Sequence, residues 1–132
     1  MKRTAKSLVD EAMVQVTTYT PEQARALHGH PGVQFVDVRD IRELEREGVI
    51  PGAIHAPRGM LEFWVDPESP YYKEAFGTGQ RFVLYCASAW RSALAADALQ
   101  EMGFGPVAHL AGGFTAWKAA GGEVAERHAR GL

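Results

Sequence analysis

Short apolar runs alternate with amphipathic stretches along the chain. Runs rich in β-branched and aromatic residues predict buried strands, and weaker alternation predicts shorter ones, at residues 14–17, 33–38, 53–55, 81–85 and 107–110. Helical spacing or a helix start signal marks the stretches between them, at residues 5–13, 20–27, 40–46, 91–102 and 114–119. Strands that alternate with helices in this way indicate an α/β domain with a mostly parallel sheet.

Two of the helix starts carry specific signals. Thr20 is followed by Pro21 and Gln23, which supplies an N-cap, a proline at the first helical position and a capping-box residue. Asp40 and Glu43 form a similar capping pair at the start of a strongly charged stretch. We expect this second helix to lie on the surface of the domain.

Residues 57–79 are the least regular part of the chain, with aromatic side chains among prolines and acids. We favour a long connection that folds over the core with its own aromatic plug. The alternative is the wall of a pocket or a surface for a partner. Residues 123–132 are polar, and we expect this tail to be frayed.

Composition and charge exclude several classes of function. A chain of 132 residues fits one domain, and its net charge of −2, with basic residues scattered among acids, predicts no nucleic-acid partner. No apolar run approaches the roughly 18 residues of a membrane span, and the first residues lack the pattern of a secretory signal. We also expect no metal site, because the pair His28 and His30 has no cysteine or carboxylate at a useful spacing.

The only cysteine, Cys86, ends an apolar run and precedes a short polar turn and a helix. The N-terminus of a helix offers unpaired N–H groups and a positive dipole end, which stabilise a thiolate, and Arg91 adds a positive charge. The alternative is a small buried residue at a strand end. A single cysteine cannot form an internal disulfide or a C-x-x-C pair, which favours a reducing compartment and a cytoplasmic location.

Asp37 and Arg39 end another strand, so a parallel sheet can bring them to the same edge as Cys86.

Four segments in order give the chain a resemblance to a single-domain rhodanese. They are residues 37–39 (Asp-Val-Arg), 48–57 (Gly-Val-Ile-Pro-Gly-Ala-Ile-His-Ala-Pro), 86–92 (Cys-Ala-Ser-Ala-Trp-Arg-Ser) and 111–117 (Ala-Gly-Gly-Phe-Thr-Ala-Trp). The resemblance implies a five-stranded, mostly parallel sheet with helices on both faces. It divides the chain into an N-terminal helix and short strand (1–17), a rhodanese-like domain (18–122) and a C-terminal tail (123–132).

The resemblance also implies a sulfurtransferase that needs no cofactor. Cys86 would take a sulfane sulfur from thiosulfate or a persulfide donor, become a persulfide, and pass the sulfur to a thiol, to cyanide or to a protein acceptor. The residues that would form the cradle around the sulfur are Ala87, Ser88, Ala89, Trp90, Arg91 and Ser92. Asp37 and Arg39 would support that loop. Trp90 would shield the sulfur or contact a partner, with core packing as the competing interpretation.

Two departures from the family pattern bear on the function. Rhodaneses that use thiosulfate often carry a basic residue directly after the cysteine, where this chain has Ala87. The usual histidine of the Gly-His-Ile-Pro-Gly segment is Val49 here.

A related cysteine-loop phosphatase or arsenate reductase is a competing hypothesis, but phosphatase loops place one residue more between cysteine and arginine than the four found here. A non-catalytic interaction module on the same fold is the other alternative.

Overall fold

The computed structural model describes residues 1–127, which form a five-stranded sheet in the order β1-β5-β4-β2-β3. All four strand pairs are parallel. The strands are β1 (Thr17–Tyr19), β2 (Val33–Asp37), β3 (Ile54–His55), β4 (Arg81–Tyr85) and β5 (Val107–Leu110). The predicted α/β class and parallel sheet are therefore confirmed, with β4 at the centre of the sheet.

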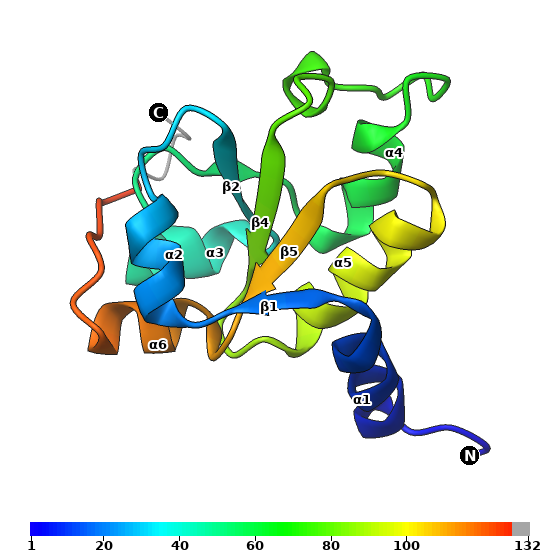
Figure 1. The fold of residues 1–132 in the computed structure, drawn as a ribbon, viewed down its shortest axis with the longest axis horizontal. Helices are drawn as coiled ribbons and strands as arrows, with labels where there is room; N and C mark the ends of the chain where they lie inside the picture. Colours follow the sequence, from blue (N-terminus) through cyan, green and yellow to red (C-terminus); the bar gives the residue numbers. More distant parts are fainter. Residues whose placement is uncertain (128–132) are drawn as a thin grey trace.

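Six α-helices accompany this sheet, and they lie on both of its faces (Figure 1). They are α1 (Ala5–Gln15), α2 (Pro21–Leu27), α3 (Ile41–Glu47), α4 (Leu61–Val65), α5 (Trp90–Glu101) and α6 (Gly113–Ala119). Side chains of α4 and α5 belong to the hydrophobic cluster on one face, whereas those of α2 and α6 belong to the cluster on the other. The predicted two-sided covering of the sheet is thus confirmed.

The alternation of side chains along β4 decides which way Cys86 points. Phe82 and Leu84 belong to the cluster under α4 and α5, while Val83 and Tyr85 belong to the cluster under α2 and α6. Cys86 continues the first series, since successive side chains of a strand point to opposite faces. The thiol therefore lies on the side of the sheet that α5 covers.

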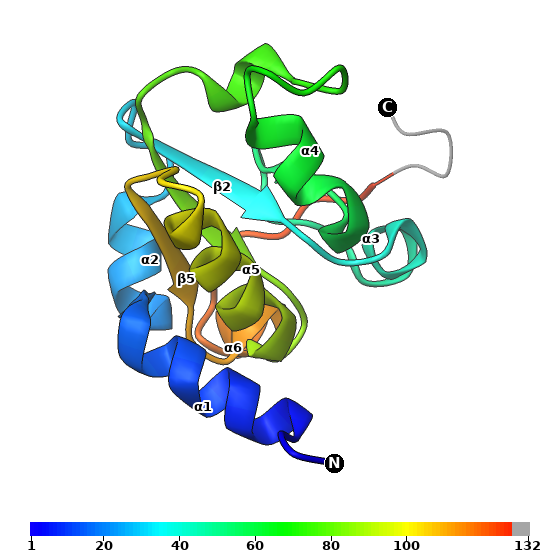
Figure 2. The same ribbon diagram turned by 90° about the vertical axis from the view of Figure 1, so that its right-hand side faces the viewer.

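The first helix is longer than the sequence pattern predicts. The stretch 14–17 resembles a half-buried strand, but the helix continues to Gln15 and the strand begins only at Thr17. Val14 is 81% exposed, so the alternation there does not reflect burial against a core. Val9 and Ala12 instead pack α1 against Ala93 of α5, as the view in Figure 2 shows for the two helices.

Residues 57–79 combine a core plug with an exposed surface. Leu61 and Phe76 are buried, which supports a connection folded over the core. The expectation of an irregular segment is wrong at Leu61–Val65, where α4 forms and packs against the cluster under α5. Phe63 and Tyr71 are about half exposed and contact one another edge to face, so one side of the segment faces solvent.

The described part of the C-terminal tail is anchored to the domain. Ala125 exchanges two backbone hydrogen bonds of 2.9 Å with Val49, and the indole of Trp117 donates to the carbonyl of Glu123 at 2.8 Å. The expectation of fraying is therefore wrong for residues 123–125, while its part at 128–132 lies outside the described residues. Among the helices of residues 1–127, none has the length and apolar character needed to cross a membrane.

Candidate active site

Backbone N–H groups converge on the sulfur of Cys86. The residue follows β4 directly, is 1% exposed, and its Sγ accepts hydrogen bonds from the N–H of Ala89 at 3.1 Å and of Ser92 at 3.4 Å. Helix α5 begins at Trp90 without a side-chain cap, so Sγ takes the place that a capping oxygen usually fills. This arrangement favours negative charge on the sulfur.

The turn that aims these N–H groups is strained at one residue. Ala89 has a φ of 101°, in the left-handed region, and no other non-glycine residue in the described chain has a positive φ. Such backbone costs on the order of 1–3 kcal/mol and is typically found at functional sites. In this left-handed conformation the N–H of Ala89 points back toward Sγ. The usual extended conformation of an N-cap residue would not direct it there.

The N-terminus of α6 holds the loop from its other side. The N–H of Phe114 donates to the carbonyl of Cys86 at 2.8 Å, and that of Thr115 donates to the carbonyl of Ala87 at 3.2 Å. Gly113 permits this approach, since a Cβ there would lie 2.5 Å from the carbonyl oxygen of Cys86. The second glycine of the fourth sequence segment is thus required by close packing against the cysteine loop.

Arg91 does not act on the sulfur as a free positive charge. Its guanidinium makes a two-pronged ion pair with Glu43 of α3, with N–O distances of 2.8 and 3.0 Å. The pair raises the pKa of Arg91, with a smaller contribution from Cys86, and lowers the pKa of Glu43. Sequence reasoning missed Glu43 as part of this site because its capping role at Asp40, which it also fulfils, already explained it.

Asp37 and Arg39 form a buried ion pair at the end of β2. Both are 1% exposed, and Nη2 of Arg39 lies 2.7 Å from Asp37 and 2.8 Å from the carbonyl of Gly48. The guanidinium also lies over the ring of Phe114, 4.3 Å from its centroid. Within residues 1–127 its hydrogen bonds go to these groups and not to Cys86. The pair therefore contacts the cysteine loop indirectly, because Arg39 packs on Phe114 and the N–H of Phe114 donates to the carbonyl of Cys86.

The remaining loop residues face solvent or a small cavity. Ser88 is exposed, and Trp90 is 50% exposed, which excludes core packing for that indole. Ala87 lines a cavity of about 270 Å³ together with Glu43, Arg46 and Lys118, among others. A side chain at position 87 thus projects beside charges of both signs.

Sequence reasoning also missed a buried histidine beside the loop. The hydroxyl of Ser92 lies 3.6 Å from Sγ of Cys86 and 3.0 Å from Nδ1 of His109 on β5. His109 is completely buried. The available signal was a histidine inside the otherwise apolar strand 107–110, which only the strand order connects to the cysteine.

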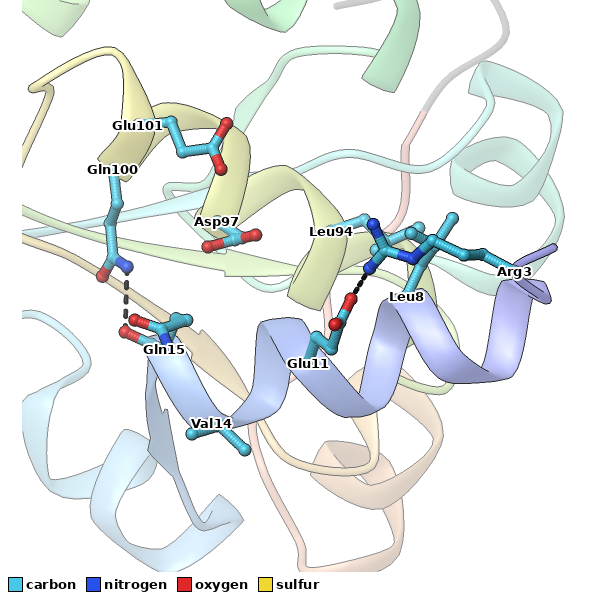
Figure 3. A pocket seen from close by; sticks show the side chains of 9 residues that line it. All are labelled: Arg3, Leu8, Glu11, Val14, Gln15, Leu94, Asp97, Gln100 and Glu101. Atoms are coloured by element: carbon cyan, nitrogen blue, oxygen red, sulfur yellow. Dashed lines mark hydrogen bonds and ion pairs between the residues drawn. The ribbon is translucent and has the colours of Figure 1, made fainter.

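A groove larger than the cavity beside Ala87 lies elsewhere, between α1 and α5 (Figure 3). It has a volume of about 750 Å³ and is crossed by an ion pair between Arg3 and Glu11. Its lining includes Asp97 and Glu101 and none of the residues of the cysteine loop. Of the cysteine loop, Ala87 lines the smaller cavity of about 270 Å³ instead.

Comparisons with known proteins agree with this geometry. A sulfurtransferase of Allochromatium vinosum is 32% identical over 85 residues, which span 64% of this chain and 71% of that protein. The polysulfide-sulfur transferase of Wolinella succinogenes has 29% identity and a TM-score of 0.69, covering 96% of this chain and 90% of that one. A Rhodopseudomonas palustris protein of unknown function, described as a possible tyrosine phosphatase, has 51% identity and a TM-score of 0.92 over 95% of this chain and 96% of its own.

The chain spans 66% of the length of a mouse relative, the thiosulfate sulfurtransferase/rhodanese-like domain-containing protein 3, with 27% identity over 103 residues. The family model for the rhodanese-like domain matches residues 20–120. This range contains the cysteine loop, the arginine pairs around it and the glycine turn before α6. The chain therefore belongs to the rhodanese-like domain family, whose relatives here include sulfurtransferases.

Proposed function

We propose that this protein is a sulfurtransferase that carries a sulfane sulfur on Cys86. The Cys86 thiolate attacks the outer sulfur of thiosulfate or of a persulfide donor. The S–S bond of the donor breaks, and sulfite or a thiolate leaves with the bonding electron pair. An acceptor thiolate or cyanide then attacks the outer sulfur of the Cys86 persulfide, and the cysteine thiolate leaves. No outside oxidant or reductant is needed, because each bond formed replaces one that breaks.

The observation that carries this proposal is the convergence of two backbone N–H groups on Sγ of Cys86. Thiolate and persulfide both carry negative charge at this position. Hydrogen-bond donors that are already in place stabilise such charge without reorganisation during the reaction. The N–H groups of Ala89 and Ser92 form this cradle, Ala87 and Ser88 connect it to the cysteine, and Ser92 adds a hydroxyl.

The other site residues would act around this centre. Arg91, shared with Glu43, supplies positive charge at the mouth of the cradle. Asp37 and Arg39 hold α6 in place, so that its N–H groups fix the carbonyls of the loop. The exposed Trp90 is available to a partner that brings or receives sulfur. The donors and acceptors are small sulfur compounds and a protein acceptor, and the chemistry described requires no cofactor.

Phosphatase activity is the second candidate, favoured by the description of the Rhodopseudomonas palustris relative as a possible tyrosine phosphatase. Two features argue against it. Only four residues separate Cys86 from Arg91, one fewer than in the phosphatase loops that this loop resembles. Arg91 is also occupied by the carboxylate of Glu43, where a phosphatase arginine would bind phosphate oxygens.

Mass spectrometry of the intact protein tests the two candidates side by side. After incubation with thiosulfate or a small persulfide, we expect a gain of one sulfur atom that cyanide removes and that Cys86→Ser lacks. The same preparation should not hydrolyse para-nitrophenyl phosphate. Hydrolysis of the phosphate ester that depends on Cys86, without any gain of sulfur, would replace the proposal by the phosphatase.

A further inference from the structure

A chain of buried hydrogen-bonding groups leads from Cys86 to the edge of the sheet. Sγ lies 3.6 Å from Oγ of Ser92, which lies 3.0 Å from Nδ1 of His109. On the other side of the ring, Nε2 of His109 lies 3.0 Å from the hydroxyl of Thr18. Ser92 and His109 are completely buried, whereas Thr18 is partly exposed on the edge strand β1. The chain thus joins the buried sulfur to a residue that is partly exposed.

His109 is uncharged in this environment. Burial lowers the pKa of His109 to about 4, and its two hydrogen-bond partners are hydroxyl groups, not carboxylates. A neutral imidazole has one N–H and one bare nitrogen, so it donates on one side and accepts on the other. Either assignment is compatible with its two neighbours, since each hydroxyl can donate or accept.

The position of the imidazole proton decides what Ser92 offers to the sulfur. The serine hydroxyl has a single hydrogen, for which Sγ, Nδ1 of His109 and the carbonyl of Ala89, at 3.2 Å, compete. When Nδ1 is bare, it attracts that hydrogen, and Ser92 can only accept from a thiol. When Nδ1 carries the proton, it donates to Oγ, which leaves the serine hydrogen free to point at a thiolate.

We propose that Ser92, His109 and Thr18 form a reversible hydrogen-bond chain whose direction follows the ionisation of Cys86, with His109 changing tautomer and not charge. With the thiol, the donors are S–H, Oγ–H and Nε2–H, and every bond points toward Thr18. With the thiolate, the donors are the Thr18 hydroxyl, Nδ1–H and Oγ–H, and every bond points toward the sulfur. His109 is thereby a positioning residue that acts through Ser92.

One proton leaves when the chain reverses. The S–H proton moves to Oγ of Ser92, while the serine proton moves to Nδ1 of His109. The Nε2 proton moves to the oxygen of Thr18, and the former proton of Thr18 passes to water. No group in the chain gains a net charge, which matters because a charged imidazole without a carboxylate partner is costly in a buried site.

The two arginines beside the site, Arg91 and Arg39, are already paired, whereas Lys118 of α6 lines the cavity beside Ala87. Arg91 of α5 is bound to Glu43 of α3, and Asp37 and Arg39 at the end of β2 are bound to each other. His109 on β5 is the remaining titratable group with a described route of hydrogen bonds to the sulfur. If His109 had only a structural role, each of its ring nitrogens would need a hydrogen-bond partner, and the direction of those bonds would not change with the ionisation of Cys86.

Nitrogen NMR of the His109 ring distinguishes the two roles, because Nδ1–H and Nε2–H tautomers have different ¹⁵N shifts. In the wild-type protein we expect the ring to change from the Nε2–H to the Nδ1–H tautomer over the pH range in which Cys86 ionises. In Cys86→Ser the tautomer should stay constant over that range. A single tautomer throughout in the wild type, or an imidazolium ring, would overturn the proposal.

Alkylation of Cys86 by iodoacetamide as a function of pH supplies the second test. We expect His109→Phe, which keeps a ring but no nitrogen, to raise the pH midpoint of alkylation by roughly one unit. His109→Asn places an amide where Nδ1 stood and should recover part of that rise. Thr18→Val should raise the midpoint by less than His109→Phe. An unchanged midpoint in a folded His109→Phe variant would refute the role of His109.

The inference rests on the proposed role of Cys86 as the nucleophile, but neither test contains a sulfur donor. If the tautomer follows Cys86 while no sulfur is gained from any donor, the proposed function fails and the chain stands. If sulfur is transferred while the tautomer stays fixed, the chain fails and the proposed function stands.

Discussion

Gly113→Ala should damage the cysteine loop without touching the sulfur. A Cβ at position 113 would lie 2.5 Å from the carbonyl oxygen of Cys86 and 2.6 Å from the carbonyl carbon and oxygen of Ala87. These are backbone atoms, so no side-chain rotation relieves the contact. Because Cβ contacts under 3.0 Å essentially do not occur, α6 and the loop must separate by several tenths of an ångström. The hydrogen bond from Phe114 to Cys86 would lengthen as they do.

Two costs add in this variant. Alanine at the φ of +60° costs about 1–2 kcal/mol in backbone energy. Forcing a methyl group into packed surroundings costs about 1–3 kcal/mol more. The free energy of unfolding should therefore fall by about 2–5 kcal/mol, which lowers the thermal midpoint by about 6–25 °C for a domain of this size.

Gly103→Ala is the matched control. Gly103 has a φ of +85°, but a Cβ there meets nothing within 4 Å, so this variant carries the backbone cost alone. Thermal unfolding and initial rates of sulfur transfer should be measured for both variants. We expect Gly103→Ala to transfer sulfur at the wild-type rate, and Gly113→Ala to lose roughly 10- to 100-fold as the cradle shifts. Equal stability of the two variants, with full activity in Gly113→Ala, would refute the packing argument.

Three further substitutions test the charges and the nucleophile. Cys86→Ser should reduce sulfur transfer to background while the thermal midpoint stays near that of the wild type, and substantial residual transfer would exclude the persulfide mechanism. Glu43→Gln should free the charge of Arg91 and lower the KM for thiosulfate about two- to fivefold, whereas an unchanged KM would show that this charge does not reach the donor. Ala87→Arg should also lower that KM, and added salt should weaken the gain; unaltered kinetics would mean that position 87 does not face the donor.

Much of the fold follows from local pattern. The largely apolar runs that become β2, β4 and β5 are buried strands, and the capping pair at Thr20 starts α2 as predicted. The failures lie where tertiary contacts override local pattern. Residues 14–15 alternate like a strand but stay helical, because α1 is held on α5 by contacts earlier in that helix. Helix α4 has no side-chain cap, so the sequence contains no start signal for it. Its buried side chains Leu61 and Val65 pack in the cluster that contains α5, a contact that local sequence does not predict.

The sequence likewise predicts one part of the candidate site and not the other. Cys86 and the turn after it are contiguous, so the approach of the Ser92 N–H could be anticipated from a strand, a turn and a helix in sequence. Glu43, His109 and Thr18 are distant in sequence from Cys86. The strand order β1-β5-β4-β2-β3 places His109 on β5 beside β4, and Thr18 on β1 beside β5. Sequence spacing contains no information about that order. The partner of Arg91 was equally hidden, because a capping role already accounted for Glu43.

The charges around Cys86 bear on the kind of donor the loop can accept. Each arginine near the loop has its own carboxylate, with Arg91 bound to Glu43 and Arg39 to Asp37. The backbone groups that donate hydrogen bonds to the sulfur are neutral dipoles, namely the N–H groups of Ala89 and Ser92 at the start of α5. Dipoles at a helix terminus favour a single negative charge at short range but attract distant ions weakly. Thiosulfate, with two charges, gains most from unpaired cations, and within residues 1–127 both arginines beside the loop are bound to carboxylates. If Cys86 carries sulfur as proposed, we therefore expect a persulfide donor of lower charge to react faster than thiosulfate.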